Sequence, residues 1–131
     1  MGWTTFMLGV PRVGDLDQIN ERVNARIEGR DADATKPWRI IAAEDAILDG
    51  CCHDYAVTKR AELLGRGWPR SRLLLAEVGY STKEDHMVLI AVLDNGEQMV
   101  LDNLRPITPW SASGYHLIRR QSAADPNLWE S

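Results

Sequence analysis

Hydrophobic residues recur at helical spacing near the start of the chain. Four of them follow one another at intervals of 3, 4 and 4 residues: Leu16, Ile19, Val23 and Ile27. This spacing places them on one face and predicts an amphipathic helix of about four turns. Asp15 is a suitable N-cap and Gly29 a suitable end, so we expect the helix between these two residues.

A second helical pattern follows after a polar stretch. We expect a loop over 30–37, which is polar and ends in proline, and a short helix over 40–48. A longer helix is expected from about Cys52 to Leu64, because apolar residues four and seven positions apart share one face there. Gly65 ends this helix, and Pro69 prevents its continuation.

The second half of the chain is typical of strands. We expect a strand over 73–80, and residues 86–93 form an almost unbroken apolar run that predicts a central strand buried on both faces. Asp-Asn-Gly at 94–96 is a hairpin signal, which makes 98–102 the return strand, and a last strand is expected over 115–121. Helices followed by antiparallel strands predict an α+β fold with the helices packed on one side of the sheet.

The composition is that of one globular domain. The 131 residues suffice for a hydrophobic core, which we place at about 15–121, with a weakly patterned tail at 122–131. The net charge of −4 argues against a nucleic-acid partner. We see neither a signal peptide nor an apolar run of roughly 18 residues, so we expect a cytoplasmic protein without a membrane partner. The oligomeric state stays open.

The two cysteines, Cys51 and Cys52, are adjacent and cannot cross-link distant segments. Cys52 is expected in the first turn of a helix. The positive end of the helix dipole there favours a thiolate, which is the nucleophilic form of cysteine. The alternative interpretation is a small apolar residue packed in the core.

A nucleophilic thiol needs a base, and His86 is the best candidate. It opens the buried strand, so its side chain can project from the sheet edge toward a helix N-terminus. The alternative is an ordinary loop histidine. His53 adjoins Cys52 and points in a different direction, and His116 lies in a strand of weaker pattern.

Asp102 ends the return strand and is the candidate that orients His86; the alternative is a solvated strand-end carboxylate. A two-residue turn would put the two side chains on opposite faces, leaving Asn103 as the orienting residue. A three-residue loop with a bulge puts Asp102 opposite Val88, which shares a face with His86 and allows a diagonal contact. A five-residue loop would pair them directly. We therefore predict an odd-length loop.

Three short segments carry the most specific signal in the sequence: G-C-C-H-D-Y-A at 50–56, H-M-V-L at 86–89 and V-L-D-N-L at 100–104. They resemble the G-D-C-E-D-Y-A, H-x-V-L and V-L-D-N motifs of the bacterial transglutaminase-like cysteine proteinases. The Cys, His and Asp of the three segments are 34 and 16 residues apart. Val23, Asn24 and Trp38 also match the family's usual helix and tryptophan positions, and the resemblance covers roughly 15–110.

The resemblance implies a papain-like, transglutaminase-like domain in which a helix beginning at the nucleophile packs on an antiparallel sheet. Cys52 would be the nucleophile, His86 the general base and acid, and Asp102 the residue that orients His86. The expected activity is hydrolysis of a protein or peptide amide through a thioester, with the Cys52 N–H binding the oxyanion. Trp38, whose indole N–H is the candidate for a second oxyanion donor, and Trp110 are expected to border the cleft. An amine in place of water would give transglutamination, and a bacterial or phage origin fits.

The sequence departs from the family beside the nucleophile. In the best-studied branch, which is periplasmic and releases surface adhesins, two acids flank the cysteine and are associated with calcium binding together with the following Asp. Here Cys51 and His53 replace those acids and only Asp54 remains. Thiol and imidazole serve calcium poorly, so we expect no calcium and no other cofactor. We do not extend adhesin release to this chain.

Three other interpretations stay open. The first is a catalytically inactive binding module of the same fold, and the second is an amidase or transglutaminase that uses the same residues. The third is a zinc site made from His86 and residues 51–54 of the first motif, although adjacent ligands do not have the spacing that closes a tetrahedral site. A redox pair of adjacent cysteines is disfavoured because C-x-x-C is the usual spacing.

Overall fold

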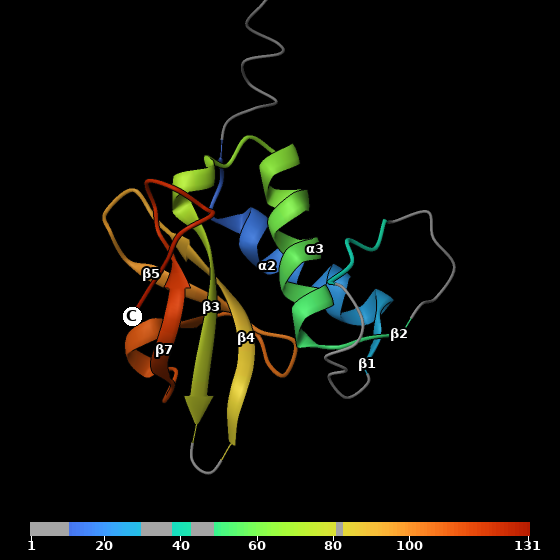
Figure 1. Ribbon diagram of the computed structural model, residues 1–131. Coiled ribbons are helices and arrows are strands. Elements are labelled where there is room, and N and C mark those ends of the chain that lie inside the picture. Colours follow the sequence, from blue (N-terminus) through green and yellow to red (C-terminus); the bar gives the residue numbers. More distant parts are fainter. Residues whose placement is uncertain (1–10, 30–37, 43–48, 81–82) are drawn as a thin grey trace, which may run out of the picture.

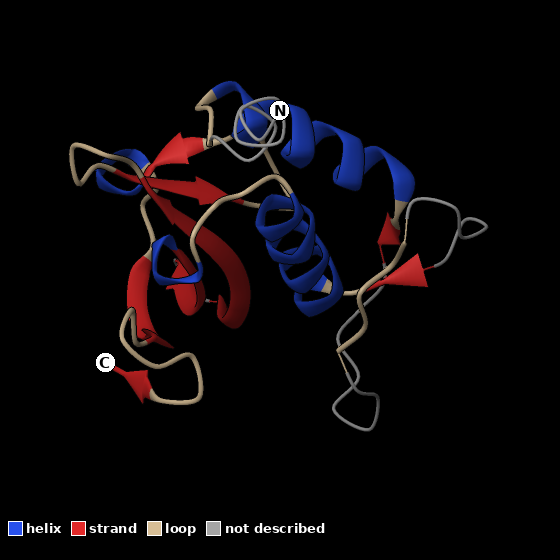
Figure 2. Cartoon of the chain, turned by 90° about the horizontal axis from the view of Figure 1, so that it is seen from above, coloured by secondary structure: helices blue, strands red, loops and turns tan. Residues whose placement is uncertain are grey.

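The computed structural model describes residues 11–29, 38–42, 49–80 and 83–131, and every structural statement below refers to these ranges. Two helices, α2 (Gly14–Arg26) and α3 (Cys52–Gly65), lie on one face of an antiparallel sheet (Figures 1 and 2). The strand order is β6-β5-β4-β3-β7-β8. The strands are β3 (Leu73–Tyr80), β4 (Lys83–Val92), β5 (Gln98–Leu101), β6 (Thr108–Pro109), β7 (His116–Gln121) and β8 (Trp129–Glu130). The expected α+β architecture is thus confirmed.

The two long helices occupy the predicted segments with small differences at their ends. α3 begins at Cys52, as predicted. α2 ends at Arg26 rather than at Gly29, because the backbone becomes extended from Ile27 onward. The following residues form β1 (Glu28–Gly29), which pairs in parallel with β2 (Asp49–Gly50). The loop expected over 30–37 lies outside the described residues. So does most of the short helix expected over 40–48, whose described residues, 40–42, are not helical.

The core has two layers, one on each face of the sheet. Between helices and sheet, the apolar face of α2 meets side chains of β3 and β4 such as Leu75, Met87 and Leu89. On the other face, Val88 and Ile90 belong to a smaller apolar cluster. Alternate residues of β4 are therefore buried on opposite faces, which confirms the predicted central strand.

The hairpin between β4 and β5 fixes where the polar residues at its open end meet. The N–H of Leu93 donates to the carbonyl of Glu97 at 2.8 Å, which closes a three-residue loop. Gly96 has φ +87°, a conformation that glycine adopts without a steric penalty. Leu89 pairs with Leu101, so Asp102 lies opposite Val88. The predicted odd-length loop is confirmed.

The C-terminal third contains elements that the pattern did not predict. A 3₁₀ turn, η2 (Trp110–Ala112), follows β6, and the predicted last strand is present as β7. The segment expected to be a weakly patterned tail contributes β8, whose Trp129 pairs with Gln121 of β7. Among the described residues, no helix is long and apolar enough to cross a membrane.

Candidate active site

Cys52 is the first residue of α3, and its half-buried side chain packs against the cluster between helices and sheet. The carboxylate of Asp54 accepts a hydrogen bond from the N–H of Cys51 at 3.1 Å, which satisfies a donor at the helix start. A Cβ at Gly50 would lie 2.9 Å from a methyl group of Ile27, so a larger residue there would force that side chain to shift. These contacts fix the turn that presents Cys52.

His86 is buried at 4% exposure and makes a hydrogen bond through Nε2 to Oδ1 of Asp102 at 3.0 Å. The rings of Tyr80 and Tyr115 flank the imidazole, with centroids 5.8 and 5.7 Å from it. The Cys52 thiol lies near this imidazole and helps to raise its pKa. Since Nε2 faces Asp102, Nδ1 is the ring nitrogen left for the sulfur.

The carboxylate of Asp102 is surrounded by donors. Oδ1 accepts from His86 and from the N–H of Leu104 at 3.1 Å. Oδ2 accepts from the hydroxyl of Tyr115 and lies 3.4 Å from Nε of Arg105. The guanidinium of Arg105 also lies over the Tyr115 ring, 4.6 Å from its centroid. A buried carboxylate with this set of partners remains ionised.

The charges of this pair follow from its contacts. Burial lowers the pKa of His86, but the hydrogen bond to Asp102 and the nearby Cys52 thiol outweigh it and raise the pKa to about 9. Burial raises the pKa of Asp102, and the hydrogen bonds from His86 and Tyr115 outweigh it and lower the pKa. At neutral pH the imidazole is therefore a cation held between an anion and a thiol.

Helix α2 contributes polar contacts behind Asp102 that the sequence reasoning missed. Nδ2 of Asn24 donates to the carbonyl of Asp102 at 2.9 Å, and Nδ2 of Asn20 donates to the carbonyl of Arg105 at 3.2 Å. The buried amine of Lys59 donates to Oδ1 of Asn20 at 2.7 Å. Two amides inside an apolar helical face, four residues apart, were the available signal.

Comparison with known proteins identifies the family of the chain. A family model described as bacterial transglutaminase-like cysteine proteinase matches residues 4–131. The chain belongs to this family. Among solved structures, Legionella pneumophila LapG is similar, with a TM-score of 0.69 and 23% identity over 89% of this chain and 68% of that chain. Its calcium-bound form gives a TM-score of 0.67 with 22% identity over 89% of this chain and 69% of that one.

These likenesses show a shared fold. The EGTA-treated form of LapG matches with a TM-score of 0.65 and 22% identity over 87% of this chain and 66% of that chain. No curated protein matches the chain significantly. The family is one of cysteine proteinases, which supports a cysteine protease that acts on a protein substrate.

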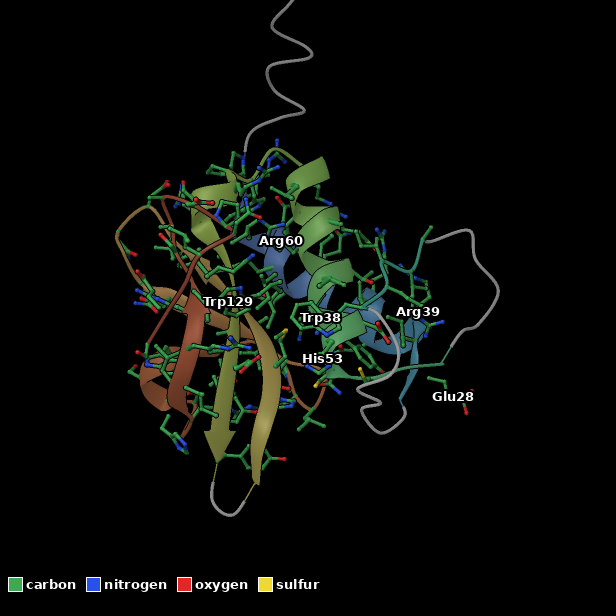
Figure 3. The ribbon with its side chains drawn as sticks, viewed as in Figure 1. Glu28, Trp38, Arg39, His53, Arg60 and Trp129 are labelled. Carbon is green, nitrogen blue, oxygen red and sulfur yellow. The ribbon has the colours of Figure 1, made fainter. Side chains whose placement is uncertain are left out.

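The other predicted site residues are Trp38, Trp110 and Asn103, and they lie at different distances from the catalytic candidates. Trp38 is 44% exposed and stacks on His53 at 4.9 Å, beside the first turn of α3 (Figure 3). Trp110 packs against the outer apolar cluster and borders a hollow of about 240 Å³ at the closed end of the hairpin, which neither Cys52 nor His86 lines. Asn103 does not take the orienting position: its buried Oδ1 has no hydrogen-bond partner among the described residues.

The residues beside Cys52 already have protein partners where calcium would need oxygen ligands. Oδ1 of Asp54 accepts the N–H of Arg39 at 2.8 Å, and the Arg39 guanidinium lies 3.6 Å from Oδ2. Sγ of Cys51 lies 3.3 Å from Nδ1 of His53. Calcium takes six or more oxygen ligands, and no group of three possible metal ligands occurs within the described ranges. The described residues here do not fit a calcium ion.

Proposed function

We propose that this chain is a cysteine peptidase in which Cys52, His86 and Asp102 are the catalytic residues. One observation carries the proposal: a buried imidazole is hydrogen-bonded to Asp102 at 3.0 Å and lies near the thiol of Cys52, which stands at a helix N-terminus and helps to raise the pKa of His86. This arrangement supports the order of nucleophile, base and orienting group that the reaction needs. Membership of a cysteine proteinase family supports a protein or peptide substrate.

The resting state follows from the electrostatics. With its pKa raised to about 9 by Asp102 and Cys52 against the effect of burial, His86 is an imidazolium at neutral pH. The sulfur of Cys52 lies beside this cation and at the positive end of α3. Both features stabilise negative charge on the sulfur and so favour its attack on the substrate.

In the first half of the reaction, the Cys52 thiolate attacks the carbonyl carbon of the scissile amide. The carbonyl oxygen becomes an oxyanion, for which the N–H of Cys52 at the helix start is the candidate donor. His86 gives its proton to the leaving nitrogen as the C–N bond breaks, which leaves a thioester on Cys52 and a neutral imidazole.

In the second half, neutral His86 removes a proton from water, and the resulting hydroxide attacks the thioester carbonyl. The C–S bond breaks and releases the product as a carboxylic acid, which then loses its proton to the solvent. The thiolate and the imidazolium are restored, so protons balance over the cycle. Asp102 keeps the ring oriented and stabilises its charged form in both halves.

We further propose that the enzyme works without calcium at the start of α3. Asp54 already accepts two backbone N–H groups, from Arg39 and Cys51, and faces the Arg39 guanidinium. These donors neutralise the carboxylate that a cation would otherwise bind. The turn that presents Cys52 is therefore held by protein groups alone.

The proposed function is tested by alkylation and by peptide cleavage. At pH 7, iodoacetamide is expected to modify Cys52 at least about tenfold faster than buried Cys51, and His86→Gln is expected to slow the modification of Cys52 but not that of Cys51. Mass spectrometry of a diverse peptide library is expected to detect cleavage by the wild type and by Cys51→Ala but not by Cys52→Ala. Equal slow alkylation of both thiols, with cleavage unchanged in Cys52→Ala, would contradict the proposal and favour a binding module.

A further inference from the structure

Two asparagines of α2 bind the backbone of the loop that carries Asp102. Asn24 donates to the carbonyl of Asp102 itself, and Asn20 donates to the carbonyl of Arg105, three residues later. The asparagines are four residues apart, so their side chains lie one above the other on the same face of the helix. Together they hold both ends of the turn at 102–105.

Asp102 needs such support because it lies just beyond its strand. β5 ends at Leu101, so the ladder with β4 does not extend over Asp102. Catalytic groups have to be held within about 0.5 Å of their working positions. The contacts from α2 replace the missing ladder and act on the backbone, while His86 and Tyr115 contact the carboxylate.

Lys59 of α3 fixes the orientation of Asn20. Its amine donates to Oδ1 of Asn20 at 2.7 Å, which turns the NH₂ group of that amide toward the carbonyl of Arg105. The Lys59 side chain is fully buried, and burial lowers its pKa to about 7 although the charge of Asp102 opposes this. Lysine is almost never fully buried without a partner.

These polar residues occupy positions where apolar side chains would serve the core. Asn20 is 1% exposed and stands next to Ile19 in the buried face of α2, and Lys59 stands between Ala56 and Leu63 on α3. A buried polar pair is often no more stabilising than an apolar pair of the same shape. Core stability therefore does not account for them, whereas the contact with the Asp102 loop does.

We propose that Asn20, Asn24 and Lys59 are positioning residues that hold Asp102 in line with His86. The proposal rests on the proposed function only in that Asp102 is assigned to orient the catalytic histidine. The three residues act on Asp102 through the backbone of its loop and do not touch the reacting atoms. They form a chain of hydrogen bonds from both helices to the sheet side of the site.

The first test is Asn24→Leu, read by the NMR titration of the His86 imidazole. Leucine has a similar shape and carries no charge, so only the hydrogen bond to the Asp102 carbonyl is lost. We expect the pKa of His86 to fall from about 9 by about 0.5–1, which is a roughly three- to tenfold change in its proton affinity. The matched control is Val23→Ala, a buried neighbour on α2 that lowers the melting temperature without changing the His86 titration.

The second test is the double variant Asn20→Leu/Lys59→Met, which removes the buried amine and its acceptor together. We expect an unchanged or higher melting temperature, but at least about threefold faster hydrogen exchange of the Leu104 N–H, which donates to Asp102. An unchanged His86 titration in Asn24→Leu, or unchanged Leu104 exchange in the double variant, would overturn the proposal. Both readouts are independent of peptide cleavage, so a failure of the proposed peptidase function is recognised separately.

Discussion

Replacing Lys59 by methionine is expected to change how the stability of this protein depends on pH. The amine is fully buried, and its pKa falls from an ordinary 10.5 to about 7 because burial outweighs the attraction of Asp102. The unfolded chain therefore binds this proton more tightly than the folded protein does. Lys59 penalises folding fully below pH 7, and the penalty disappears as the pH rises from 7 to 10.5.

The size of this effect follows from the two pKa values. A gap of about 3.5 pH units at 1.36 kcal/mol per unit corresponds to roughly 5 kcal/mol of unfolding free energy. Methionine removes the titration but leaves Oδ1 of Asn20 without its donor, which costs about 1–3 kcal/mol at every pH. Only the pH-dependent part identifies the buried amine.

His86 contributes with the opposite sign. Its folded pKa of about 9 lies above the ordinary 6.5, so its stabilisation is complete below pH 6.5 and is lost as the pH rises through 9. For this buried group the loss is roughly 3 kcal/mol. In the wild type the gain from Lys59 between pH 7 and 9 nearly offsets this loss. In Lys59→Met only the loss remains.

The assay is urea unfolding followed by tryptophan fluorescence at pH 6, 7, 8, 9 and 10. We expect a nearly flat free energy between pH 7 and 9 for the wild type, and a fall of roughly 3 kcal/mol from pH 6.5 to 9 for Lys59→Met. Val23→Ala serves as a control, since it removes no titratable group and shifts the curve equally at each pH. A constant difference between Lys59→Met and the wild type across this range would refute the reasoning.

Two further outcomes are expected. Tyr115→Phe removes a hydroxyl that donates to Asp102 and should lower the free energy of unfolding in urea by about 1–3 kcal/mol. The control is Tyr80→Phe, because the Tyr80 hydroxyl bonds to no described residue. Its free energy of unfolding should stay within about 0.5 kcal/mol of the wild type. Calcium at millimolar concentration, compared with EGTA, should change neither the melting temperature nor the alkylation rate of Cys52, because Asp54 is already paired with Arg39; calcium-dependent alkylation would refute this.

Local signals were sufficient for the elements that build the site. The Asp-Asn-Gly sequence favours a three-residue loop with glycine at positive φ. The register that this loop sets between β4 and β5 places Asp102 diagonal to His86. The start of α3 could be predicted for a similar reason, because Gly50, two residues before Cys52, leaves room for the turn. In both places the decisive interactions lie within a few residues along the chain.

The remaining partners of Asp102 could not be read because they come from distant segments. Tyr115 and Arg105 reach the carboxylate from the loops that flank β6 and η2, and β6 has only two residues. Lys59 has no local partner either: its acceptor, Asn20, is 39 residues away. Such contacts depend on how the layers pack, so periodicity indicates a polar residue in a buried face without naming its partner.

The departures from the family motif beside Cys52 do not affect the contacts that form the site. A carboxylate at the third position of a helix satisfies the free N–H of the N-cap residue, and Asp54 does this while binding Arg39. Cys51 and His53, which replace acids, contact each other, and His53 stacks on Trp38. One retained acid, Asp54, is therefore enough to hold the start of the helix. A sequence can lose its neighbouring acids and still present Cys52 to His86.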